Sequence, residues 1–191
     1  MTVLRCTAKL LKRLRQPPKL PEPPPADNPL GEWYADIDFI DREPFVLLLN
    51  AATGAGMVLP GRAAELRNLH VHAGQQLFKL FMHYRFDLNE YPLAGAEILA
   101  WQQPPVYANT RDRSLLGSMN QFKDTAWLHF AHDNRSLPEA ASRQWEGLFR
   151  HPSFAAPGRR YGYEDWKRPL DLVHARFLAQ GAPQPQTQTV H

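Results

Sequence analysis

The fold is decided by a stretch with three strand patterns, WYADIDFIDREPFVLLLNAATGAGMVL, at residues 33–59. Apolar and polar residues alternate over Trp33–Ile40, as in a strand with one buried face. Phe45–Leu49 is continuously apolar, which is typical of a strand buried on both faces. Met57–Leu59 forms a third short apolar run, and turn residues separate the three at 42–44 and 53–56. The stretch therefore predicts an antiparallel three-stranded meander.

Elements predicted on both sides of the meander complete the fold. Before it, Val3–Cys6 has the composition of a short strand, and Thr7 is placed to cap a helix whose leucines recur at helical spacing. After it, the patterns predict a long helix over 66–84 with Gly74 as its weak point, a helix at Leu93–Trp101, a strand at Val106–Asn109, and helices over 119–132, 136–150 and 170–178. The predicted fold class is α+β, a small, mainly antiparallel sheet packed against several helices.

The chain is predicted to form one domain over residues 1–178. Its 191 residues, 43% of them apolar, are ordinary for a single globular domain. Seven prolines lie between Pro17 and Pro29. Because proline lacks an amide donor, residues 15–31 are expected to be an extended connector within the domain. The polar residues 179–191, rich in Pro and Gln, are expected to be a disordered tail.

The cysteine content and the apolar runs predict a cytoplasmic protein with no membrane partner. Cys6 is the single cysteine, so no intrachain disulfide can form. The first residues are basic and lack the apolar run of a signal peptide, and Phe45–Leu49 is far too short to span a bilayer. Cys6 is expected to be buried and structural. The alternative is a nucleophile whose thiol pKa is lowered by the helix start that follows it.

Four segments together resemble a known family. They are VLRCTAKLLKRL at 3–14, GEWYAD at 31–36, FVLLLN at 45–50 and SLLGSMNQF at 114–122. In this order they resemble the bacterial DUF6933 group of domains of unknown function, over roughly Thr2 to Arg150. Gln121 stands where the group has an acid. The resemblance implies one compact domain, and it implies no activity, cofactor or substrate.

A candidate anion site lies at the loop and helix start around residues 111–120. Ser118 and Gln121 have the spacing of a capping box, which predicts a helix from Met119. Amides at a helix N-terminus can bind an anion, and neighbouring arginines can grip a phosphate or carboxylate bidentately. The candidate binding residues are Arg111, Arg113, Gly117, Ser118 and Asn120. The alternative is a capped helix beside solvated arginines.

A candidate nucleic-acid contact lies on the predicted first helix. The chain carries a net charge of +3, and six basic residues precede its first acid, Glu22. Lys9, Lys12 and Arg13 fall opposite the leucine face, where they could follow a nucleic-acid backbone. The segment matches no known nucleic-acid-binding motif, so a merely solvated face is the alternative.

No metal or cofactor is predicted. His129 and His132 are spaced for a helical pair with Asp133 beside them, but no HExxH motif or cysteine pair accompanies them. The sequence favours a binding module for an anionic partner, either a nucleic acid or a phosphorylated ligand. A protein partner is a further option. The alternative from another class is a small enzyme with its pocket at Arg111–Asn120 and an unspecified reaction.

Overall fold

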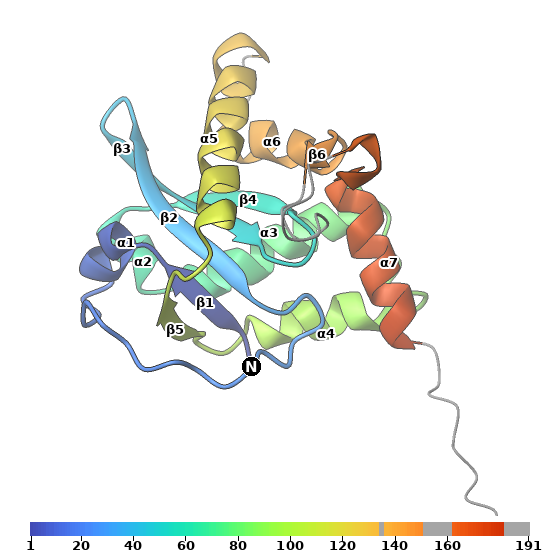
Figure 1. Cartoon of the computed structure of the whole chain (residues 1–191), viewed down its shortest axis with the longest axis horizontal. Coiled ribbons are helices and arrows are strands. Elements are labelled where there is room, and N and C mark those ends of the chain that lie inside the picture. The colour runs from blue at the N-terminus through green and yellow to red at the C-terminus, as the bar shows by residue number, and fades with distance from the viewer. Residues whose placement is uncertain (134–135, 151–161, 182–191) are drawn as a thin grey trace, which may run out of the picture.

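The computed structural model describes residues 1–133, 136–150 and 162–181 (Figure 1). Its strands are β1 (Val3–Cys6), β2 (Trp33–Ile40), β3 (Glu43–Asn50), β4 (Gly56–Pro60), β5 (Val106–Asn109), β6 (Phe149–Arg150) and β7 (Trp166–Lys167). Its α-helices are α1 (Ala8–Arg13), α2 (Ala63–Leu66), α3 (Leu69–His83), α4 (Pro92–Ala100), α5 (Arg113–Asp133), α6 (Leu137–Ser142) and α7 (Pro169–Gly181). The predicted α+β class is confirmed.

A five-stranded sheet in the order β4-β3-β2-β1-β5 forms the centre of the fold. The predicted meander is β2, β3 and β4, paired antiparallel. A two-residue turn at Asp41 and Arg42, both with positive φ, joins β2 to β3, and such turns match the twist of a hairpin. Strand β1 lies between β2 and β5 and runs parallel to both. The antiparallel pairings are the longer ones, so the sheet is mainly antiparallel, as predicted.

Alternating side chains of the sheet build two cores, one on each face. Trp33 and Ile37 of β2 pack on one face with residues of α1, α3, α4 and α7. Tyr34 of β2 and Leu47 of β3 pack on the other face with α5. In Figure 1, α5 crosses the front of the sheet and α3 runs behind it. The continuous apolar run of β3 is buried on both faces because both layers of helices cover it.

The long helix predicted over 66–84 is interrupted six residues before the expected weak point. Arg67 and Asn68 separate the short α2 from α3, while Gly74 stays inside α3. A Cβ on Gly74 would lie 3.3 Å from the Cβ of Trp101. Glycine at this position therefore lets α3 cross close to the end of α4.

The helix predicted over 136–150 ends early, at Ser142. A 3-10 turn follows at Arg143–Trp145. The indole Nε1 of Trp145, which is fully buried, donates to the carbonyl of Gly56 at 2.7 Å, and the Gln144 amide bonds to the same loop. A continued helix would turn these side chains away from the sheet, so the tertiary contacts override the local helix pattern.

The Pro-rich connector contains neither helix nor strand, and it lies against β1 and β5. The side chain of Asn109 accepts from the Leu20 amide at 2.8 Å and donates to the Pro18 carbonyl at 2.9 Å. Of the predicted disordered tail, residues 179–181 belong to α7, and residues 182–191 lie outside the described part of the chain.

Candidate functional site

Arg111, from the predicted anion site, belongs to a network of four charged side chains centred on Arg5. The Arg5 guanidinium, at 1% exposure, contacts Glu22 at 2.5 Å and Glu32 at 2.7 Å. Arg111 pairs with the same two carboxylates at 2.8 and 3.2 Å. Hydrogen bonds from Arg5 hold the pKa of both glutamates below their usual value. An external anion at Arg111 would have to displace carboxylates of the chain itself.

The helix start predicted at Ser118 is wrong. α5 begins at Arg113, and the Asp112 carboxylate accepts from the amides of Ser114 at 2.8 Å and Leu115 at 3.2 Å. Asp is as good an N-cap as Ser, and the earlier start lets Leu115 join the core against the sheet. Ser118 is consequently a mostly buried residue inside the helix. The amides after Ser118, on which the predicted anion site depended, lie inside α5, and Asp112 bonds two amides at the actual helix start.

The other residues of that predicted site lie along one exposed side of α5. Arg113, Gly117 and Asn120 are exposed along α5, and a Cβ on Gly117 would meet no atom within 4 Å. The glycine therefore lies in open space. Anion binding by these residues stays a prediction.

The predicted nucleic-acid contacts lie on one exposed side of α1. Lys9, Lys12 and Arg13 are all exposed, while the leucines of the helix are buried. The Arg13 guanidinium lies 5.3 Å from the centre of the Phe39 ring, in a cation–π contact with the β2–β3 hairpin. The Lys9 Nζ atom donates to the carbonyl oxygen of Ile37 at 3.4 Å. The hairpin thus orients two of the three cations.

Beyond the end of α1, three arginines line one hollow of about 210 Å³, here called the basic hollow. α1 and α2 both contribute to its lining, and no acid of the described residues takes part: the lining comprises Arg13, Leu14, Arg15, Ala63, Leu66 and Arg67. Among the described residues, none of the three arginines has a carboxylate within 4.0 Å. An anion in the basic hollow would therefore displace no carboxylate of the described part of the chain.

Arg15 reaches the basic hollow from a strained backbone position. Its amide donates to the Lys12 carbonyl at 3.3 Å, and the next amide donates to the Leu11 carbonyl at 2.9 Å, which together make a Schellman ending of α1. The φ of Arg15 is +57°, in the left-handed region where glycine is usual. An L-residue there costs about 1–2 kcal/mol. Strain of this kind is often kept where a side chain has a function.

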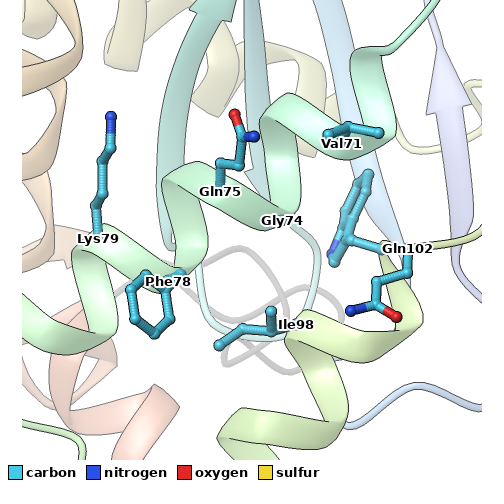
Figure 2. A pocket seen from close by; sticks show the side chains of 8 residues that line it. Val71, Gly74, Gln75, Phe78, Lys79, Ile98 and Gln102 are labelled. Carbon is cyan, nitrogen blue, oxygen red and sulfur yellow. The ribbon is translucent and has the colours of Figure 1, made fainter.

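A second hollow, the apolar groove, lies between α3 and α4 (Figure 2). It has a volume of about 590 Å³ and is lined by Val71, Gly74, Gln75, Phe78, Lys79, Ile98, Trp101 and Gln102. Val71 and Phe78 are large apolar side chains, yet they are 40% and 45% exposed. The groove is thus an uncovered apolar surface with one cation in its lining.

The remaining candidates are a thiol and a histidine pair. Burial raises the pKa of the Cys6 thiol far above its ordinary value, and nearby Asp36 adds to the effect, so the thiol stays protonated. His129 and His132 lie on α5, whereas the Asp133 side chain is outside the description. Within the described residues, no cluster of three or more His, Cys, Asp or Glu could hold a metal ion. No helix in that same part of the chain is long and apolar enough to cross a membrane.

The sequence did not indicate that the three arginines of the basic hollow lie together. Arg13 and Arg15 belong to the basic opening of the chain, but Arg67 comes from a separate segment without any local signal. The apolar groove was missed too. A signal for it existed, because Val71, Phe78 and Met82 recur on one side of a helix whose opposite side already carries the core stripe.

A comparison with models of protein families gives a match over most of the chain. A family model described as a domain of unknown function, DUF6933, matches residues 3–157. No curated protein matches the chain.

Proposed function

The chain belongs to the DUF6933 family, and we propose that it is a binding module that holds a nucleic-acid backbone at the basic hollow and the adjoining lysines of α1. One observation carries the proposal. Three guanidinium groups at the ends of α1 and α2 line a single hollow in which the described residues place no acid.

The chemistry of the basic hollow suits phosphate. Arginine offers planar paired donors that match phosphate oxygens, and it keeps its charge at every physiological pH. The aliphatic lining from Leu14 and Leu66 removes water from one side of the site, which strengthens the attraction between the charges.

The row of cations beyond the hollow favours a polymer over a single small phosphate. Lys9 and Arg13 are four residues apart on α1, about 6 Å along the helix axis. Successive phosphates on one strand of a duplex advance by about 3.4 Å along its axis. The row together with the hollow can therefore meet more than one phosphate of the same backbone.

Salt dependence tests the proposal. Binding of a fluorescent duplex and of a single strand is measured by anisotropy over a range of salt concentrations. Each phosphate contact contributes a slope of about −0.9 for duplex and about −0.7 for single strand. Replacing Lys9, Lys12 and Arg13 together by Ser should flatten the duplex slope by about 2–3 units. The fold should be unaffected, because all three side chains are exposed.

A matched pair of variants isolates the hollow. Arg15 and Arg85 both follow a helix in a Schellman ending, with φ of +57° and +58°. Changing either one to Gly should stabilise the fold by about 0.5–1 kcal/mol, once the entropy of the unfolded glycine is subtracted. Only Arg15→Gly should reduce the salt slope, by about 1. Equal binding by the two variants would contradict the proposal.

Arg113→Ala distinguishes the proposal from the site predicted at the start of α5. It should leave binding unchanged if the basic hollow holds the backbone. If Arg113→Ala loses binding and Arg15→Gly binds normally, the anion site lies instead at the residues predicted from the sequence, Arg111, Arg113, Gly117, Ser118 and Asn120.

A further inference from the structure

The floor of the apolar groove is rigid. The Trp101 indole Nε1 donates to the buried Glu97 carboxylate at 3.1 Å, and the ring meets Trp33 edge-on at a centroid distance of 5.9 Å. Gly74 packs directly over Trp101, because a Cβ at this position would lie 3.3 Å from the Trp101 Cβ. The groove therefore rests on a fixed, fully buried tryptophan, and its floor would not have to become ordered on binding.

The walls are apolar and elongated. Val71 and Lys79 are eight residues apart on α3, which is about 12 Å along the helix. In Figure 2 they lie toward opposite ends of the groove, and Ile98 of α4 lies between them. A narrow, extended apolar molecule fits this shape. The volume of about 590 Å³ is within the range of small-ligand sites, about 300–1,000 Å³.

The polar groups of the lining define the head of that molecule. Gln75 and Gln102 supply amides, and among the described residues that line the groove Lys79 is the one with a charge. Figure 2 shows the Lys79 side chain extending away from Ile98 on a flexible stem, so its ammonium can turn to meet a ligand at that end. Charge complementarity therefore calls for an anionic head group next to Lys79.

We propose that the apolar groove binds a medium-chain carboxylate, with the alkyl chain along Phe78 and Ile98 and the carboxylate at Lys79. This site is separate from the basic hollow, because the two share no lining residue. It is also chemically different, since most of the contact would be apolar and only the head group is charged.

Decanoate and its uncharged counterpart decanol, both kept below their micelle concentrations, are the probes. Calorimetry and tryptophan fluorescence should show one saturable equivalent of each. Lys79→Gln should weaken decanoate by about three- to fivefold, the upper range for an exposed ion pair, and leave decanol unchanged. Phe78→Ala should weaken both by about tenfold through lost apolar contact.

Two variants outside the groove serve as matched controls. Leu128→Ala removes an apolar side chain of similar exposure from α5, and Lys167→Gln removes another exposed lysine. Neither should change the affinity for decanoate. Non-saturable uptake, or equal effects of Phe78→Ala and Leu128→Ala, would overturn the proposal.

Self-association would also overturn it. If a second copy of the chain covers the groove, sedimentation would show a dimer. Phe78→Ala would then dissociate this dimer, and decanoate would not bind to it. Nucleic-acid binding should be unchanged in Phe78→Ala, so failure of one proposal remains distinguishable from failure of the other.

Discussion

Glu97→Gln is expected to destabilise the fold strongly, because the Glu97 carboxylate is fully buried and surrounded by donors. Its Oε2 accepts from the Leu30 amide at 2.8 Å and from Asn28 Nδ2 at 2.9 Å. Its Oε1 faces the indole N–H groups of Trp33 at 3.2 Å and Trp101 at 3.1 Å. One side chain of α4 thus ties the end of the connector to β2.

The magnitude follows from the geometry of the replacement. If the Gln amide oxygen takes the Oε1 position, its NH₂ group faces the Leu30 amide, so two donors oppose each other where an acceptor stood. The reverse orientation places the NH₂ group against both indoles. Either way at least two buried groups lose a partner, at about 1–3 kcal/mol each, for a total of about 2–6 kcal/mol. This is a large part of the stability of an ordinary domain, about 5–15 kcal/mol.

Urea unfolding followed by tryptophan fluorescence measures this loss. The midpoint should fall while the m-value stays constant, since the surface exposed on unfolding is the same. The exposed Glu90→Gln is the control and should stay within about 0.5 kcal/mol of the unchanged protein. Equal stability of Glu97→Gln and the unchanged protein would refute the reasoning, because it would mean that the donors do not depend on the second carboxylate oxygen.

The remaining predictions concern pH, a helix cap and the thiol. The hydrogen bond from Arg5 lowers the pKa of Glu32 below its ordinary 4.5, so its contribution to stability is complete above 4.5 and is lost as pH falls below it; this slope, measured by urea titration, should vanish in Glu32→Gln. Asp112→Ala should cost about 1 kcal/mol by thermal unfolding as the loss of a helix cap, whereas Ser118→Ala should cost less than about 0.5 kcal/mol. Cys6 should react with iodoacetamide only on unfolding, and rapid labelling of the native protein would show that the thiol is accessible.

The parts of the fold with strong local patterns could be predicted from the sequence. The meander combines alternation in β2 with a continuous apolar run in β3, and each pattern has one structural meaning. Thr7 was identified as a cap because it directly precedes the leucines of α1, and its hydroxyl does accept from the Leu10 amide. These features depend only on neighbours in the chain.

Features that depend on distant residues could not be predicted. Asp112 and Ser118 are both good caps, and the choice between them depends on burying Leu115 against the other face of the sheet. Arg67 joins Arg13 only because α2 packs beside the end of α1. The pairing of Arg111 with Glu22 likewise depends on the path of the connector over β1. In each case a tertiary contact decides between local alternatives.

The position of β1 between β2 and β5 has a consequence for synthesis of the protein. Val3 of β1 pairs with Val106 of β5, so the ribosome must add about a hundred residues before this edge can close. At about 5–20 residues per second this takes roughly 5–20 s. During that time a nascent sheet of β1 to β4 exposes unsatisfied backbone groups along one side, which can pair with other chains. A truncation before Val106 would make this exposure permanent, and the shortened polypeptide should aggregate even though its meander is intact.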